Sequence, residues 1–402
     1  MNRTLPDARP RSFDRFGREH VELAPTPTHD RASSLDWERV EPDCSAQCFF
    51  EHNPRICPDP DPNFSYWTWV VRDDSARVVL LWTNPVFDYT DVSRMEMVRR
   101  NGRWTITLRL PSALRFSYRI SVWRSDDEPP WRQVQGRRNV LLAAAAAAEL
   151  DPDCVAIINP RLGEISSVAA GPTAPRQVWR EPVGEGNVVK LDGDTSVYVP
   201  PTAEPTPLLV LYDGQNWLSL GLPGILDQLI EAGLMRPAHV LFVDSSDNDY
   251  RRANLGVPGG QVDTVIDRWL PAVRRRFAVD PSGERTIVAG QSLGGIAALW
   301  TLALSGGAVR HAIAQSPSLW RFDVTDSLLD APNWSSLHLH AGAYEGDMLL
   351  NVRTLKDDLN IDPRLGDRSV VATGFEAGHD WAAWRVNLVN SLRDLLESFE
   401  AQ

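Results

Sequence analysis

A serine flanked by glycines stands where a strand is expected to turn into a helix. Residues 290–294 read Gly-Gln-Ser-Leu-Gly, the form G-x-S-x-G, between a predicted strand at 285–289 and a predicted helix at 293–304. In such a turn the serine hydroxyl stands clear of the sheet, and the start of the helix favours negative charge that develops nearby. A chance serine in an ordinary turn is the alternative, but the flanking elements favour a nucleophile at Ser292.

A serine nucleophile needs a base, and hydrolases with this turn carry their residues in the order Ser, acid, His. His379 is the one histidine that follows His340, and it comes directly after a predicted strand at 369–375. We expect His379 to take the serine proton, a surface histidine that opens the last helix being the alternative. The adjacent Asp380 is interpreted as a helix cap.

Two carboxylates follow the preceding predicted strand at 337–342, and either could orient the histidine. They are Glu345 and Asp347, and we favour Glu345. The other carboxylate is expected to cap the next helix or to lie in its first turn, where negative charge is favourable.

Acyl transfer also needs hydrogen-bond donors for the oxyanion. The backbone N–H of Leu293, directly after the nucleophile, is the first candidate, and the loop at 212–217 after the third predicted strand should supply the second. In this loop we choose the N–H of Gln215, with Gly214 giving the backbone its freedom. A plain turn capped by Asp213 is the alternative.

Four further side chains are candidates for substrate contacts. Arg251 and Arg252 lie in a long predicted loop after a strand, where paired guanidinium groups could hold an anionic or oxygen-rich ligand. Solvated surface charge is an equally weighted alternative. Trp217, and with it Trp384, could stack on an aromatic substrate, although buried tryptophans are commoner.

The chain divides by its patterns into two domains. Residues 176–402 alternate strands with helices and predict an α/β-hydrolase domain. Residues 36–159 show short alternating strands, including a hairpin around Asn101-Gly102, and predict an immunoglobulin-like β-sandwich. Residues 160–175 are interpreted as a linker, and the polar residues 1–35 as a flexible N-terminal arm.

The composition narrows the function classes. The 402 residues carry a formal net charge of −12, which argues against non-specific nucleic-acid binding. We expect no membrane span and no secretory signal, hence a cytoplasmic protein. The cysteines, Cys44, Cys48, Cys57 and Cys154, are interpreted as reduced thiols rather than a zinc site. Neither metal nor cofactor is needed for the predicted chemistry, and the oligomeric state is not indicated.

Taken together, these segments resemble the enterochelin (ferric enterobactin) esterase family. The likeness rests on residues 211–217 (LYDGQNW), 290–295 (GQSLGG) and 378–381 (GHDW). It extends to residues 79–82, 95–111, 116–120 and 151–160, which are similar to that family's N-terminal domain.

The resemblance implies hydrolysis of the ester bonds of a catecholate siderophore, free or ferric, and release of iron in the cytosol. It implies the roles given above for Ser292, His379 and Glu345, and a contact from Arg251 to catecholate or ester oxygens. The chain departs from the family at two places in the substrate loop: Asn254 stands where the family often has Glu, and residues 256–260 replace its Pro-Cys-Asn run. The alternative function is an esterase for polysaccharide-linked or other acyl esters, with the β-sandwich as a binding module.

Overall fold

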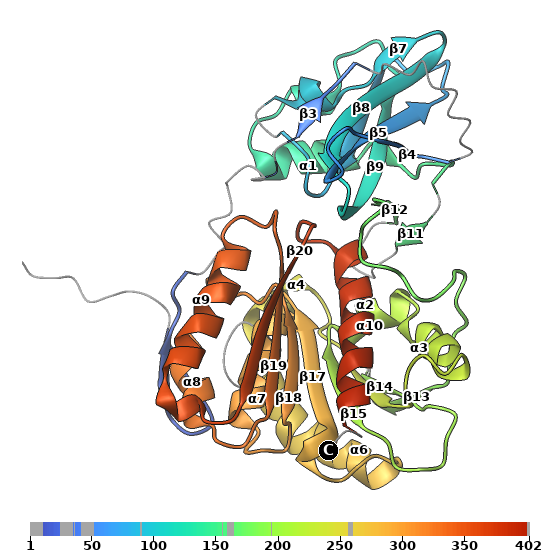
Figure 1. Ribbon diagram of the computed structural model, residues 1–402. Coiled ribbons are helices and arrows are strands. Elements are labelled where there is room, and N and C mark those ends of the chain that lie inside the picture. The colour runs from blue at the N-terminus through green and yellow to red at the C-terminus, as the bar shows by residue number, and fades with distance from the viewer. Residues whose placement is uncertain are drawn as a thin grey trace, which may run out of the picture.

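The structure is a computed structural model that describes residues 11–24, 35, 37–41, 52–88, 91–154, 156–158, 165–193, 195–255 and 260–399. A β-rich N-terminal domain sits at one end of a larger α/β domain (Figure 1). None of the helices in these ranges is long and apolar enough to cross a lipid bilayer.

An eight-stranded mixed sheet forms the centre of the α/β domain. Strands β16, β15, β17, β18, β19 and β20 are parallel neighbours, whereas β14 pairs antiparallel with both β13 and β16. The carboxyl ends of the parallel strands therefore meet at one edge, where the candidate site lies. In spatial order the strands are β13 (Val188–Asp192), β14 (Thr195–Tyr198), β16 (His239–Val243), β15 (Leu208–Tyr212), β17 (Thr286–Gln291), β18 (His311–Gln315), β19 (Ser336–Gly342) and β20 (Ser369–Phe375).

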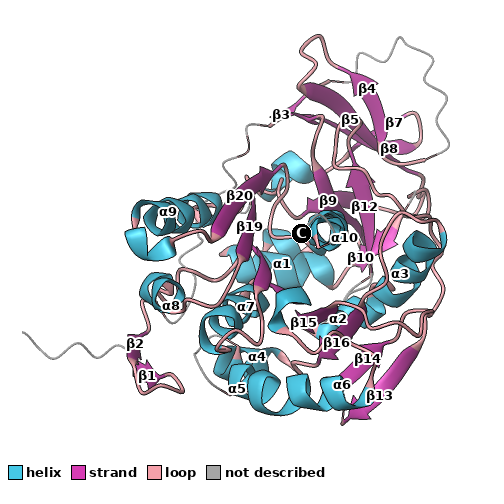
Figure 2. Ribbon diagram, turned by 60° about the horizontal axis from the view of Figure 1, so that its bottom comes forward, coloured by secondary structure: helices cyan, strands magenta, loops and turns pink. Residues whose placement is uncertain are grey.

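Helices cover both faces of this sheet, as Figures 1 and 2 show. Alternate side chains of one strand enter different cores: Val210 packs with the helices of one face and Leu211 with those of the other. Because both faces are covered, the central strands are apolar along their whole length. One face carries α5 (Gln261–Thr264), a π-helical turn (Val265–Trp269), α6 (Leu270–Arg276), α7 (Leu293–Leu304), α8 (Thr325–Asp330) and α9 (Met348–Ile361), and the other α3 (Leu222–Glu231) and α10 (Trp381–Ser398).

The N-terminal domain consists of two antiparallel sheets around one core of aromatic and aliphatic side chains. The hairpin at Asn101-Gly102 is confirmed, with φ of 49° and 75° at its two turn residues. Both backbone angles are in the left-handed region that such a tight turn requires. One sheet contains β6 (Val78–Thr83), β9 (Arg115–Trp123), β10 (Ala148–Glu149), β11 (Ile157–Ile158) and β12 (Ser166–Ala170), and the other β3 (Glu38–Arg39), β4 (Arg55–Pro58), β5 (Phe64–Val71), β7 (Val98–Arg100) and β8 (Arg103–Pro111), with α1 (Arg137–Ala145) beside them.

The structure corrects two of the predicted segment boundaries. The expected linker at 160–175 contains β12, which pairs with β9 and so belongs to the N-terminal domain. The expected flexible arm contains the hairpin of β1 (Arg11–Phe13) and β2 (Glu19–Val21), and this hairpin packs on the α/β domain. Residues 1–10 and 25–34 of the arm, and 160–164 of the linker, lie outside the described residues.

One predicted local structure also differs. The predicted loop that carries the two arginines contains α4 (Asn248–Asn254), whose N-cap Asp247 accepts from the N–H of Tyr250. Cys57 and Cys154 form no disulfide among the described residues, whereas Cys44 and Cys48 lie outside those residues.

Candidate active site

Ser292 occupies a sharp turn between β17 and α7. Its φ of 56° and ψ of −120° lie in a region that non-glycine residues rarely adopt. The glycines on either side are needed for close packing: a Cβ on Gly290 would lie 2.3 Å from the carbonyl oxygen of Gly294. The turn is fixed from the neighbouring strand, since the N–H of Ser292 donates to the carbonyl of Gln315 at 2.9 Å. The side chain is thereby presented at the carboxyl edge of the sheet.

His379 and Glu345 lie next to each other at the same edge. His379 Nδ1 is 2.7 Å from Glu345 Oε2. The Glu345 side chain is only 2% exposed, whereas the His379 side chain is 42% exposed. With Nδ1 directed at the carboxylate, Nε2 is the ring nitrogen left to accept a proton.

The second oxygen of Glu345 is held by groups that the sequence did not reveal. Oε1 accepts from the N–H of Gly342 at 2.6 Å and from the hydroxyl of Ser316 at 2.7 Å. Ser316 in turn accepts from Trp384 Nε1 at 3.0 Å, and the Trp384 ring packs edge-on against His379 at 4.5 Å between centroids. These partners fix the orientation of the carboxylate and of the imidazole it contacts.

The loop that follows β18 contacts both Glu345 and the turn of Ser292. Ser316 bonds to Glu345, and two residues later the N–H of Ser318 donates to the carbonyl of Ser292 at 3.1 Å. Ser292, Glu345 and His379 follow strands β17, β19 and β20, which share the sheet edge with β18. The structure thus gathers the three residues at one end of the sheet.

Two helix starts offer backbone donors beside the serine. Leu293 is the first residue of α7, and Gln215 lies in the first turn of α2 (Gly214–Ser219). Backbone N–H groups in a first turn have no acceptor within their own helix, so both suit an oxyanion. Glycine is needed at position 214 for close packing rather than for flexibility. A Cβ there would lie 2.6 Å from the backbone carbonyl carbon of Phe242.

The Asp213 side chain makes no capping bond to α2 but joins the loop that carries Gln215 to the serine turn. Asp213 has a left-handed φ of 57° and is completely buried. Its carboxylate accepts from Arg251 Nε and Nη2 at 2.7 and 2.8 Å, and from Gln291 Nε2 at 2.8 Å. Burial by itself would lower the pKa of Arg251. The charge and the hydrogen bonds of Asp213 have the larger combined effect, so the pKa of Arg251 is raised. Arg251 is therefore not solvated surface charge, and most of its guanidinium is already bound.

The tryptophans predicted to contact substrate lie in the protein interior. Trp217 is 0% exposed, donates from Nε1 to Gln291 at 3.2 Å and packs edge-on against Trp381. This burial contradicts the prediction that Trp217 stacks on a substrate. Trp384 is also buried and contacts the histidine instead. Arg252 is exposed on α4, so its substrate contact stays a prediction.

Several buried polar atoms in this region have no hydrogen-bond partner within the described ranges. They are Gln215 Nε2, both amide atoms of Asn216, Ser245 Oγ and Ser318 Oγ. Unpaired buried polar groups are rare because each costs free energy. Their position in the loops around Ser292 makes them candidates for substrate contacts, and no local sequence pattern distinguishes them.

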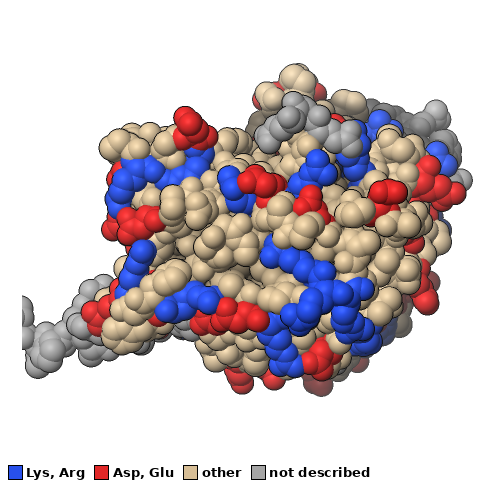
Figure 3. Space-filling view, turned by 90° about the horizontal axis from the view of Figure 1, so that it is seen from below, with Lys and Arg blue, Asp and Glu red and all other residues tan. Residues whose placement is uncertain are grey.

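The opposite end of the sheet carries a hollow of about 760 Å³. Figure 3 views this end of the molecule, where basic and acidic side chains lie close together. The arginines that line the hollow already have partners: Arg310 pairs with Glu284, Arg364 with Asp326, and Arg368 donates to backbone carbonyls. In the described residues no group of three His, Cys, Asp or Glu side chains could hold a metal ion.

The contacts of Glu345 lead to a test of which carboxylate orients the base. Asp347 is the N-cap residue of α9, whereas Glu345 contacts His379. We expect Glu345→Gln to lower kcat for ester hydrolysis by about 10²-fold or more, since a neutral amide stabilises the imidazolium poorly. Asp347→Asn should change kcat less than about threefold, since exposed surface substitutions usually have small effects. The reverse ranking in steady-state kinetics would transfer the role to Asp347.

The chain matches two family models. The model described as putative esterase matches residues 188–395, and the model described as enterochelin esterase, N-terminal, matches residues 66–180. Among curated relatives, an iron(III) salmochelin esterase of Escherichia coli O6:H1 is 28% identical over 80% of this chain and 87% of its own length. The iron(III) enterobactin esterase of Escherichia coli K12 is 29% identical over 48% of this chain and 50% of its own.

Solved structures show the same fold. The ferric enterobactin esterase of Salmonella typhimurium superimposes with a TM-score of 0.73 at 22% identity, covering 87% of this chain and 98% of that one. An enterobactin esterase of Shigella flexneri, crystallised in the presence of enterobactin, gives 0.72 at 22% identity over 87% and 97%. Because the match covers 87% of this chain, the likeness extends beyond the α/β domain into the N-terminal domain.

Proposed function

The chain belongs to the putative esterase family and carries an enterochelin esterase N-terminal domain, and from this premise we propose that it hydrolyses the ester bonds of a catecholate siderophore. The substrate class includes the trilactone of ferric enterobactin, in free or iron-bound form. The observation that carries the proposal is the pair of His379 and Glu345, 2.7 Å apart, at the sheet edge that presents Ser292. The relatives named for salmochelin and enterobactin support the choice of substrate.

The reaction proceeds through a covalent acyl-enzyme. Ser292 Oγ attacks the seryl ester carbonyl while His379 Nε2 takes its proton, and Glu345 stabilises the imidazolium that forms. The N–H groups of Leu293 and Gln215 donate to the tetrahedral oxyanion. The imidazolium returns the proton to the departing seryl oxygen. Water then cleaves the acyl-enzyme by the same steps in reverse order.

The ion pair beside this centre has a supporting role. Asp213 binds Arg251 and Gln291, and so it ties the loop of Gln215 to the turn of Ser292. A fixed spacing between the two donors keeps them ready for the oxyanion, with no reorganisation as charge develops. Arg252, exposed on the neighbouring helix, remains available for catecholate oxygens.

The proposal is tested by product analysis. Purified protein incubated with ferric enterobactin should release linear and monomeric dihydroxybenzoylserine, identified by mass spectrometry, while Ser292→Ala protein should release none. Hydrolysis of p-nitrophenyl esters with the siderophore left intact would retain an esterase but overturn this substrate class. Polysaccharide-linked esters would then be the next substrates to assay.

Two finer predictions accompany this function. We keep the immunoglobulin-like topology of the N-terminal domain and the cytoplasmic location as predictions from the sequence. Residues 256–259, in which the chain departs from the family pattern, lie outside the described residues.

A further inference from the structure

The loop that carries His379 is bound to the N-terminal domain by a buried carboxylate. Asp380 is 2% exposed, and its Oδ2 accepts from both the N–H and the hydroxyl of Ser117 in β9, at 2.6 and 2.9 Å. Its Oδ1 accepts from the N–H of Ala382 at 2.9 Å and so caps α10, as the sequence predicted. Burial raises the pKa of Asp380, and the donors from Ser117 and Ala382 oppose that rise. One side chain thus joins the helix start to the other domain.

A second residue of the N-terminal domain holds the histidine backbone directly. Asn84, just after β6, donates from Nδ2 to the carbonyl of His379 at 3.0 Å. The preceding Gly378 passes so close that a Cβ there would lie 2.5 Å from Asn84 Oδ1. The N–H of Asn84 donates to the carbonyl of Ser117 at 3.2 Å, so the two holding residues are themselves linked.

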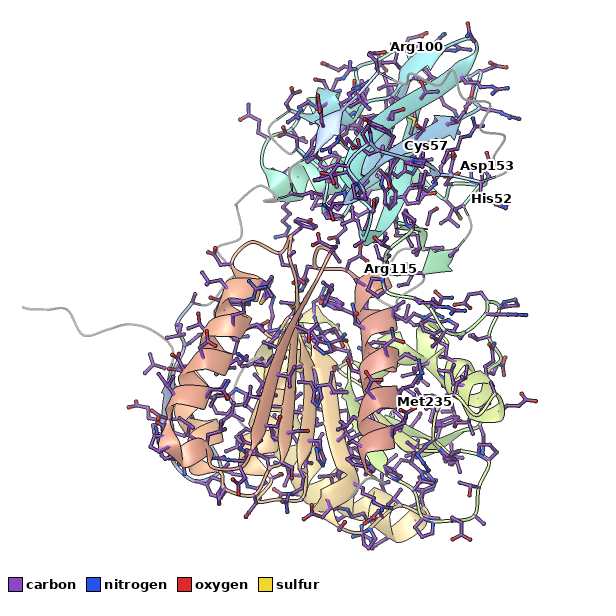
Figure 4. The ribbon with its side chains drawn as sticks, viewed as in Figure 1. His52, Cys57, Arg100, Arg115, Asp153 and Met235 are labelled. Carbon is purple, nitrogen blue, oxygen red and sulfur yellow. The ribbon has the colours of Figure 1, made fainter. Side chains whose placement is uncertain are left out.

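Further contacts bring the loop of the acid into the same junction. The N–H of Arg115 donates to the carbonyl of Glu376 at 3.2 Å, and Figure 4 shows Arg115 at the end of the N-terminal domain that faces the α/β domain. Tyr344, which precedes Glu345, packs against the core of the N-terminal domain and hydrogen-bonds through its hydroxyl to Glu376. The acid and the base therefore both come from loops that rest on this domain.

We propose that the N-terminal domain positions the base, with Asn84 and Ser117 as positioning residues that act through the loop of His379. This inference rests on the proposed function, because it takes His379 as the base. Glu345 fixes the ring at Nδ1, but the ring can reach Ser292 only from a backbone that is itself fixed. A misplacement of about 1 Å at the reacting centre can cost about 10²-fold in rate.

The first test replaces the donor of one hydrogen bond by an acceptor in a side chain of the same size. In Asn84→Asp a carboxylate oxygen faces the carbonyl of His379, which repels it and displaces the loop. We expect kcat to fall about tenfold or more, with KM for p-nitrophenyl acetate within about twofold of wild type. Asn139→Asp is the matched control, because the Asn139 amide donates to the carbonyl of Gln135 within the N-terminal domain. An equal loss of kcat in both variants would overturn the proposal.

A second variant changes the residue of the α/β domain that takes part in this contact. Asp380→Asn keeps a good helix cap for α10 but turns an amide NH₂ toward the donors of Ser117. We expect the same split between kcat and KM as in Asn84→Asp. Thermal unfolding of each variant is recorded, so that a protein that fails to fold is recognised and the other variant decides.

A double-mutant cycle separates positioning from general damage. In a His379→Ala background with imidazole supplied in solution, the base is no longer tethered to the loop, so adding Asn84→Asp should cost nothing further. A full additional loss of kcat would contradict action through His379.

The proposed function and the positioning role can fail separately. If Ser292→Ala keeps wild-type turnover, the proposed function itself fails. If Ser292→Ala is inactive while Asn84→Asp is fully active, only the positioning role fails.

Discussion

Replacement of Ser292 by alanine is expected to lower kcat for ester hydrolysis by about 10⁴-fold or more, because the substitution removes the oxygen that attacks the ester carbonyl. The residual rate would come from the oxyanion donors, which the substitution leaves in place. Steady-state kinetics with p-nitrophenyl acetate and with a ferric catecholate ester would measure the loss. A burst of acyl-enzyme in the wild type, absent in the variant, would identify the covalent step.

Ser336→Ala provides the control for this substitution. Ser336 begins β19 at the opposite end of the sheet, and its hydroxyl lies 2.7 Å from His311 Nδ1. The Ser336→Ala substitution removes a hydroxyl that contacts an imidazole, but it does so at the end of the strands opposite the candidate site. Near-wild-type turnover in Ser292→Ala would remove the nucleophile assignment, and a comparable loss in Ser336→Ala would point to damage of the fold.

The second large effect is expected for His379→Ala. Without the imidazole the hydroxyl keeps its proton during attack, so kcat should fall by about 10⁴-fold while KM changes little. Truncation should cost little stability, because the ring is 42% exposed. Imidazole added to the assay should restore part of the rate in the variant and none in Ser292→Ala.

A result that would contradict this role is full turnover of His379→Ala. His340, close in sequence to the acid, is a poor substitute as base. Burial lowers the pKa of His340 to about 4, and it is enclosed within the domain. A rise in KM with unchanged kcat in His379→Ala would instead indicate that His379 only binds the substrate.

The parts of the site that the sequence revealed are those set by local pattern. The elbow at Ser292 follows from glycine spacing between a strand and a helix, and the hydrolase chain order then directs attention to His379. Glu345 and Asp347 are two residues apart and both follow the same strand, so only coordinates bring one of them to His379. The α/β architecture was readable because strands buried on both faces are apolar throughout.

What the sequence could not reveal depends on contacts between distant segments. Ser117 and Asp380 are 263 positions apart, and nothing local marks either as a partner of the other. Trp217 was misjudged for the same reason: an aromatic residue beside a catalytic loop can face either the cavity or the core. Arg251 binds a buried carboxylate from a separate loop, a pairing that no local pattern indicates, and its contact to substrate stays a prediction. Residue types constrain what a side chain can bind, whereas the tertiary packing selects the partner.

The docked hairpin near the N-terminus has a consequence for synthesis of the chain. The N–H of Leu23 donates to the carbonyl of Arg321 at 2.7 Å, and the ring of His20 packs against Trp300 at 4.6 Å. On the ribosome, His20 and Leu23 are therefore synthesised well before Trp300 and Arg321, the partners that they contact. Contacts so distant in sequence form late and slow the completion of folding. The hairpin can dock on the α/β domain only after residue 321 has left the exit tunnel.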